Sequence, residues 1–175
     1  MKKLLLTLAI AGGITLSGFA QSTTTTTSAP SNSGGKFSIG AEAGLPVGDI
    51  SEVYSVVIGG SIKYELPVAK QTYFTISAGY NAFLLKSEFK ELGISSTANF
   101  IPIKAGIKYY SSENFFLEGQ LGAVFNTEQG GGHAFVWAPG IGYTFAGGFE
   151  AGFRYEGWTN GSTTGQLGLR LAYRF

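Results

Sequence analysis

Apolar side chains recur at every second position in eight stretches of the chain between Lys36 and Phe175. This spacing is typical of β-strands, in which successive side chains point to opposite faces of the sheet. The pattern therefore predicts an all-β fold for this region. We place the strands at residues 36–46, 54–66, 72–84, 99–110, 115–125, 134–145, 149–158 and 166–175.

Each predicted strand has one apolar face and one face with small or polar side chains, and in six of the eight strands this second face also carries charged side chains. The apolar face of the first strand carries Phe37, Ile39 and Leu45, and no charged side chain falls on the apolar face of any strand. A random arrangement would scatter the charges over both faces. Eleven charged side chains lie instead on the opposite faces: Glu42, Lys63, Glu65, Lys104, Lys108, Glu118, Glu150, Arg154, Glu156, Arg170 and Arg174.

The positions of the glycines indicate which face is turned outward. Eight antiparallel strands predict a barrel whose interior is just wide enough to be filled by side chains. A ring of leucines and aromatic residues does not fit there, whereas glycines interleaved with a few long charged side chains do. We therefore expect the apolar faces to meet lipid, which argues against a soluble ligand-carrying barrel. The glycines on the charged faces are Gly40, Gly44, Gly59, Gly79, Gly106, Gly122, Gly140, Gly142, Gly152 and Gly168.

The strand lengths and the connections agree with a transmembrane up-and-down barrel. A tilted strand crosses the hydrocarbon core in about 9–11 residues, and a closed barrel leaves no unpaired backbone edge in lipid. Outer-membrane barrels alternate short periplasmic turns with longer external loops. The predicted short turns are 67–71, 111–114 and 146–148, and the predicted long loops are 46–54, 85–98, 126–133 and 159–165.

Aromatic side chains predict two girdles at the level of the lipid headgroups, where a ring is half wet and half buried. The inner, periplasmic girdle is regular and contains Phe37, Tyr64, Phe74, Tyr109, Phe115, Phe145, Phe149 and Phe175. The outer girdle is less regular and contains Tyr54, Phe125, Phe135, Trp137 and Tyr155.

The stretch from Ala134 to Phe149 is free of charge for long enough to suggest a membrane-spanning helix. Pro139, Gly140 and Gly142 within it, together with its period of two, favour a strand. Because Pro139 has no backbone N–H to donate, we expect a local bulge at this position.

The N-terminal region predicts export. Lys2 and Lys3 precede an apolar run and a small-residue cleavage site at Ala20, so residues 1–20 are typical of a secretory signal peptide. Residues 21–35 are rich in Thr and Ser and predict a flexible linker, and residues 36–175 form the predicted barrel domain. The chain has no cysteine, which excludes disulfides and thiolate metal sites. Its basic and acidic side chains are nearly equal in number, and they form no basic surface of the kind that binds a nucleic acid.

The last predicted strand, from Gln166 to the terminal Phe175, resembles the C-terminal strand of bacterial outer-membrane barrels. The region 36–175 as a whole resembles the small eight-stranded outer-membrane proteins of the OmpA transmembrane-domain and OmpX type. The resemblance implies localisation to the outer membrane of a Gram-negative bacterium, contact with outer-membrane lipid, and a monomer. It also implies periplasmic chaperones and a barrel-assembly machinery as partners during biogenesis. The implied assembly signal consists of Gln166, Gly168, Leu171, Tyr173 and Phe175.

The charged side chains of the lumen are the main candidate site. An unpaired charge in a low-dielectric interior is costly, so we expect the groups to pair. The sequence leaves two interpretations of these charges open. They could form salt bridges that seal the barrel, or they could line a narrow path for ions. The expected pairs are Lys108 with Glu118, Glu150 with Arg174, and Glu156 with Arg170.

The sequence suggests no enzyme chemistry, and we expect no catalytic residue, no cofactor and no metal. His133 is the only histidine, and Phe135 stands where the pattern of lipid-A deacylases has a serine. The favoured function is therefore a structural role or a surface interaction, such as membrane integrity or adhesion. The principal alternative is a small porin-like channel for ions or apolar solutes. A lipid-A-modifying enzyme is a further alternative.

Overall fold

The computed structural model describes residues 34–88, 97–128 and 130–175. The predicted signal peptide and nearly all of the predicted linker lie outside these residues. Within them no helix is both long and apolar enough to cross a bilayer. The described elements are the strands β1 (Lys36–Val47), β2 (Tyr54–Ala69), β3 (Thr72–Leu85), β4 (Ala98–Tyr110), β5 (Phe115–Asn126), β6 (His133–Thr144), β7 (Phe149–Asn160) and β8 (Ser162–Arg174), with the short 3₁₀ helices η2 (Asp49–Glu52) and η3 (Ala146–Gly148).

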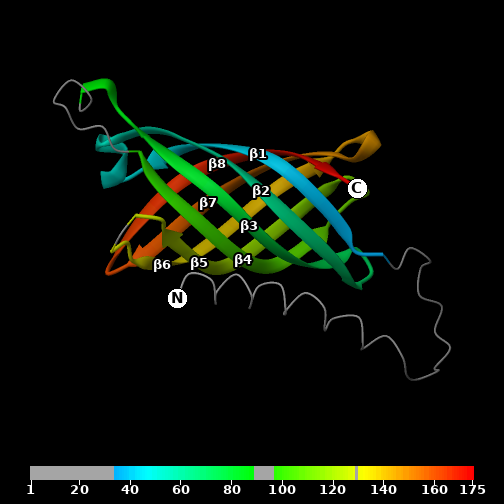
Figure 1. The fold of residues 1–175 in the computed structure, drawn as a ribbon. Helices are drawn as coiled ribbons and strands as arrows, with labels where there is room; N and C mark the ends of the chain where they lie inside the picture. Colours follow the sequence, from blue (N-terminus) through cyan, green and yellow to red (C-terminus); the bar gives the residue numbers. More distant parts are fainter. Residues whose placement is uncertain (1–33, 89–96, 129) are drawn as a thin grey trace, which may run out of the picture. The chain divides into compact units, whose positions relative to one another are not determined.

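The strands form a closed barrel in which each strand pairs with the next along the chain. All pairings are antiparallel, and the strands are tilted around the barrel, as Figure 1 shows. β1 and β8 complete the ring, with a continuous register from Ser38 opposite Arg174 to Val47 opposite Gly165. The predicted eight-stranded up-and-down barrel is therefore confirmed. β8 begins at Ser162, four residues earlier than the sequence pattern predicted.

The predicted orientation of the two faces is also confirmed. Apolar side chains stand on the outer surface of every strand; Ile39, Leu121 and Leu171 each expose more than half of their surface. Lys108 and Glu156, by contrast, are completely buried inside the ring. The molecule is thus apolar outside and ionic inside. An outer surface that is apolar around the whole barrel is characteristic of a protein surrounded by lipid rather than by water.

The connections predicted to be short and those predicted to be long lie at opposite ends of the barrel. The long loop predicted at residues 159–165 was wrong, because β7 and β8 continue their pairing to Asn160 and Ser162 and are joined by Gly161 alone. The end on the right of Figure 1, which carries the C-terminus, holds the turns between β2 and β3, β4 and β5, and β6 and β7. We call it the turn end, and the opposite end the loop end. The aromatic residues predicted for the inner girdle lie at the turn end and are exposed, except Phe74, which is half-buried. Phe175 contacts Phe37 and Tyr173 at ring-centroid distances of 6.2 and 5.0 Å, so the girdle continues across the β1–β8 seam.

Two local predictions were wrong, and both concern bulges. Pro139 causes no shift of register in either of its neighbouring strand pairs; its β6 segment stays in register with β5, while the pairing with β7 is merely interrupted. Register irregularities occur instead in β2, between Pro67 and Ala69 and between Tyr54 and Val56. The second of these affects a predicted girdle residue. One additional residue reverses the alternation of faces. Tyr54 therefore packs against Phe83, on the lumen side, and does not belong to the outer girdle.

Leu121→Arg tests the outward orientation. Leu121 lies in the middle of β5 and is 58% exposed. An arginine there would stand in hydrocarbon, so we expect the free energy of unfolding in phospholipid vesicles to fall by about 2–4 kcal/mol. Gln120→Glu is the control, because Gln120 is the neighbouring residue and is buried in the lumen. It lies beside Lys63 and Arg170, where an added carboxylate would balance the one excess cation of the lumen and should cost little. Urea titration followed by tryptophan fluorescence measures both variants, and equal losses would refute the assignment of the faces.

Candidate functional site

The lumen contains a network of ion pairs whose turn-end half is centred on Lys108 and Glu150. The Lys108 ammonium contacts Glu150 and lies 2.8 Å from a Glu65 carboxylate oxygen. The Lys63 ammonium lies 2.6 Å from a Glu118 oxygen and 4.0 Å from a Glu150 oxygen. Because the partners stand on different strands, these contacts cross the lumen between its walls.

The loop-end half of the network is centred on Arg154. Its guanidinium donates to Glu42 at 2.6 Å and to Glu156 at 2.9 Å. The Lys104 ammonium donates to the same oxygen of Glu156 at 2.5 Å. Arg154 thus holds one acid from β1 and one from its own strand, and Lys104 approaches from β4.

Arg170 joins the two halves. Its guanidinium lies 3.7 Å from Glu42 and 3.6 Å from Glu150, and it donates to the hydroxyls of Ser61 at 2.9 Å and Ser38 at 3.2 Å. Arg174 completes the network through Glu65, at 3.7 Å. All eleven predicted lumen charges, six basic and five acidic, therefore belong to a single connected network. Such an arrangement offsets the desolvation of each charge by contact with an opposite one.

The predicted pair of Lys108 and Glu118 does not form. The two residues are opposite one another in the register of β4 and β5, as predicted. Each side chain nevertheless reaches a partner elsewhere in the lumen: Lys108 reaches Glu65 and Glu150, and Glu118 reaches Lys63. A long side chain can span this narrow interior, so neighbours on adjacent strands are not its only available partners.

The two pairs predicted for the last hairpin were also wrong; they were Glu150 with Arg174, and Glu156 with Arg170. The hairpin turns tightly at Gly161, and its register places Glu150 opposite Ala172 and Glu156 opposite Gln166. The arginines are therefore displaced along β8 from the acids that we assigned to them.

An aromatic layer closes the network at the turn end. The Lys108 ammonium lies 3.9 Å from the ring centroid of Phe116, which is buried. The Tyr110 hydroxyl accepts a hydrogen bond from Arg174 at 2.6 Å and lies 2.9 Å from the Thr144 hydroxyl. The Phe116 ring occupies the space above Gly142, where a Cβ atom would stand 2.2 Å from the ring. Glycine is required at that position to admit the ring.

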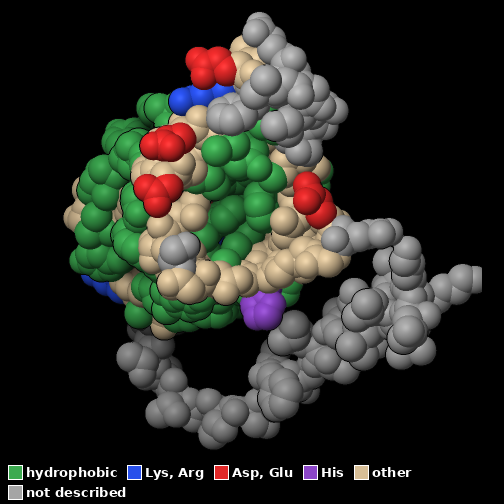
Figure 2. Space-filling model, turned by 90° about the vertical axis from the view of Figure 1, so that its left-hand side faces the viewer, with side chains coloured by type: hydrophobic (Ala, Val, Ile, Leu, Met, Phe, Trp, Pro, Cys, Tyr) green, Lys and Arg blue, Asp and Glu red, His purple; other side chains and the backbone are tan. Residues whose placement is uncertain are grey.

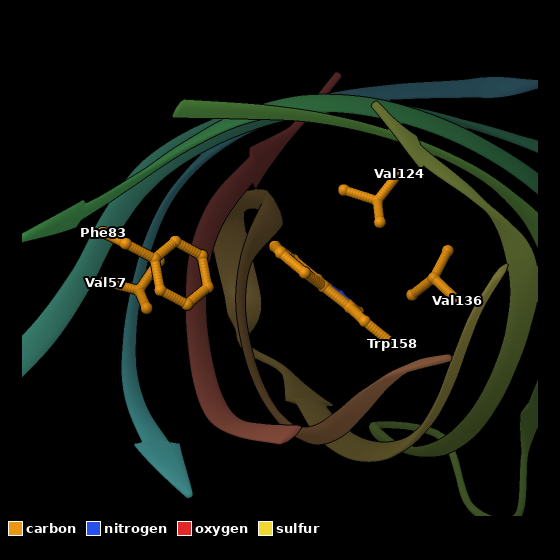
Figure 3. Packing of buried hydrophobic residues seen from close by; sticks show 5 residues of the cluster. All are labelled: Val57, Phe83, Val124, Val136 and Trp158. Carbon is orange, nitrogen blue, oxygen red and sulfur yellow. The ribbon is translucent and has the colours of Figure 1, made fainter. Parts of the chain in front are cut away.

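An apolar cluster closes the network at the loop end, and sequence analysis missed it. Its members come from β2, β3, β5, β6 and β7, and Figure 3 shows how they lie around Trp158. The Trp158 ring lies 5.1 Å from Phe83 and 4.9 Å from Phe100, and its indole N–H donates to Glu156 at 2.8 Å. We call these residues the loop-end plug: Val57, Phe83, Val124, Val136 and Trp158.

The cavities between the charged side chains are very small. Three of them have volumes of about 20, 10 and 10 Å³. A cavity of about 10–15 Å³ is needed to hold a single water molecule. Arg154 borders all three cavities, so the space beside it is divided rather than continuous.

The residues of the predicted assembly signal occupy both faces of β8. Leu171, Tyr173 and Phe175 are exposed on the outer surface. Gln166 and Gly168 are buried on the lumen side, where the Gln166 amide donates to Glu156 at 3.3 Å. The three outer residues form a continuous apolar edge along the end of the strand.

His133 lies at the loop end of β6 and is exposed. Its main-chain oxygen accepts a hydrogen bond from Asn160 at 2.9 Å, and its ring centroid lies 6.4 Å from that of Phe125. In the described part of the chain, no serine or carboxylate hydrogen-bonds to its ring. Within the described residues, no three aspartate, glutamate or histidine side chains lie close enough together to bind a metal ion.

The rim of the loop end is acidic. Figure 2 looks onto this end and shows acidic side chains around a mouth lined by apolar ones. Among the described rim residues, Lys86 is half-buried, whereas the acidic side chains are exposed. These acidic side chains are Asp49, Glu52, Glu88 and Glu128.

Comparison with known proteins identifies the fold. No protein-family model and no curated protein matches the sequence. Among solved structures, Ail, the attachment invasion locus protein of Yersinia pestis, is 18% identical over 81% of this chain and 97% of its own, with a TM-score of 0.57. The N-terminal β-barrel domain of Pseudomonas aeruginosa OprF is 14% identical over 80% of this chain and 97% of its own, with a TM-score of 0.56.

The outer-membrane enzyme PagL has the same fold; it is 14% identical over 78% of this chain and 98% of its own, with a TM-score of 0.59. The structural neighbours thus include an attachment protein, the barrel domain of a larger protein and an enzyme. At these identities the likeness concerns the fold alone. This chain has the fold of the small eight-stranded outer-membrane β-barrels.

The pair of Lys63 and Glu118 offers a test of the network's energetics. Removing one partner of a buried ion pair leaves an uncompensated charge, so Lys63→Met and Glu118→Gln should each lower the free energy of unfolding by about 3 kcal/mol. The double variant should lose less than the sum, because both charges are then absent. Urea unfolding of the four proteins in the same detergent gives the coupling energy. Strictly additive losses would show that the two groups do not interact.

Proposed function

We propose that the chain is an integral protein of the bacterial outer membrane with a structural or surface-interaction role. Its apolar outer surface, with aromatic rings gathered at the turn end, suits a bilayer and would be unfavourable in water. The predicted signal peptide, cleaved near Ala20, supplies the route of export. In this setting the turn end faces the periplasm and the loop end faces the exterior.

The filled lumen is the observation that carries the non-conducting part of the proposal. Eleven charges neutralise one another almost completely, and the cavities between them are about the size of single water molecules. Phe116 lies across the turn end of the network and the loop-end plug lies across its other end. Ion transfer would require several buried ion pairs to separate together. The ion pairs of the network connect opposite walls of the barrel and stabilise its shape.

The loop end is the surface that an external partner would meet. Ail has been crystallised with the heparin analogue sucrose octasulfate, which is a polyanion. The described rim of the present chain is mainly acidic, so a polyanion of that kind would be repelled. An adhesive role for this chain therefore suits a neutral or cationic partner.

The outer face of β8 supports recognition during assembly. Leu171, Tyr173 and Phe175 form an apolar edge that is available until the strand pairs and enters lipid. We assign these residues to contact with the barrel-assembly machinery. Gln166 and Gly168 would act before closure, since both face the lumen in the finished barrel.

A small channel is the alternative, because three separate cavities border Arg154 and would conduct if they became connected. Planar-bilayer recording of the refolded protein separates the two functions. A sealed lumen predicts no steady unitary conductance in the parent protein or in Glu118→Gln. Steady openings in the parent whose conductance changes in Glu118→Gln would establish the channel and contradict the proposal.

A lipid-modifying activity is the second alternative, because PagL is an enzyme with this fold. His133 lacks a serine or carboxylate partner in the described residues, so we expect His133→Ala to leave the lipid A profile of expressing cells unchanged. Mass spectrometry of extracted lipid A compares cells with the empty vector, the parent and the variant. A modification that the parent introduces and His133→Ala abolishes would demonstrate catalysis.

A further inference from the structure

The outer surface of the barrel carries a groove of about 610 Å³ across β4, β5, β6 and β7. Ile107 and Leu117 stand on one side, Ile141 and Phe153 stand on the other, and Tyr155 stands towards the loop end. The outward side chains of these walls are apolar apart from the hydroxyls of Tyr109 and Tyr155, and two residues of the lumen network, Glu118 and Arg154, also border the groove from the barrel wall. The groove is continuous with the exposed apolar surface of the neighbouring strands.

The floor of the groove exists because two adjacent positions lack a bulky side chain. Gly119 on β5 lies opposite Pro139 on β6. A Cβ atom at Gly119 would have no other heavy atom within 4 Å, so the space above this residue is open. The result is an open groove on the surface between two rows of branched and aromatic side chains.

The wall behind the groove is only one backbone layer thick. The pairing of β6 with β7 stops after Trp137 and resumes at Gly140, and Pro139 has no N–H to contribute in between. Gly140, Ile141 and Phe153 border the groove outside and a 20 Å³ cavity of the charged lumen inside. An apolar occupant of the groove would thicken the barrier between lipid and the lumen charges at this point.

We propose that this groove is a binding site for one acyl chain of a membrane phospholipid. The site lies within the surface that lipid covers under the proposed function, on which this inference rests. Its low floor at Gly119 and Pro139 and its branched walls fit an unbranched methylene chain, which gains favourable free energy from each methylene that it buries. A chain held there is ordered relative to the lipids that merely surround the barrel.

The outward glycines allow a matched test. Gly119→Leu fills the floor of the groove. Gly60→Leu places the same side chain on the outer face of β2, away from the groove, where the nearest atom to a Cβ is the Gly40 oxygen at 3.5 Å. Both variants add a leucine to a lipid-facing position, so both should fold, and circular dichroism confirms this.

The detergent-solubilised barrel is titrated with palmitoyl-oleoyl-phosphatidylethanolamine. Native mass spectrometry then measures how tightly each protein retains its first bound phospholipid. We expect the parent and Gly60→Leu to retain a phospholipid, and Gly119→Leu to bind it roughly tenfold more weakly. Equal retention by all three proteins, or equal loss in both variants, would overturn the site. A parent dimer that Gly119→Leu converts to a monomer, with no lipid adduct, would assign the groove to a second copy of the chain and also overturn it.

A second measurement separates this inference from the proposed membrane location. Spin-labelled phosphatidylcholine in vesicles reports all lipids whose motion the barrel restricts. If the parent restricts none, the membrane location itself fails. If all three proteins restrict a similar shell of lipid and Gly119→Leu still retains its adduct, the membrane location stands and only the groove site fails.

Discussion

The closed backbone ladder is the constraint on which the rest of the molecule depends. Hydrocarbon offers no hydrogen-bond partner to a backbone N–H or C=O group, so a sheet with an apolar outer face cannot leave an edge unpaired there. β1 and β8 remove that edge by pairing from Ser38 to Val47 along β1. A ring of eight strands is narrow, so the inner faces of opposite walls lie within reach of long side chains. The composition of the lumen follows from this width.

A narrow lumen filled by side chains tolerates charges only when they are paired, and its width lets the partners come from distant strands. Lys63 on β2 meets Glu118 on β5, and Lys104 on β4 meets Glu156 on β7. Contacts of this kind connect walls that share no backbone hydrogen bond. They therefore resist flattening of the ring, which neighbouring strands could not do by themselves. The same contacts occupy the space that a conducting path would need.

The outward and inward faces could be predicted because strand side chains alternate strictly, and lipid and lumen demand different chemistry. Tyr54 was misplaced because a bulge reverses that alternation locally, and no residue pattern marks the bulge. The partners of Lys108 were misassigned because adjacency along a hairpin was taken as adjacency in the lumen. The sequence shows directly which side chains share a face of a strand. Contacts across the barrel also depend on how far neighbouring strands are shifted against one another in the closed ring. The fold was thus more predictable than the pairing inside it.

The charged middle of the lumen lies between two apolar layers, one at each end. The loop-end plug was partly visible in the sequence, because Val57 and Trp158 lie on the same face of their strands as the charged side chains. An interior expected to hold only glycines and charges left no place for these apolar residues. Apolar layers exclude water, and a lower local dielectric strengthens every ion pair between them. The hydrogen bond from Trp158 to Glu156 ties the plug to the network. Displacing the loop-end plug would therefore weaken the ion pairs beneath it. The plug and the network stabilise one another.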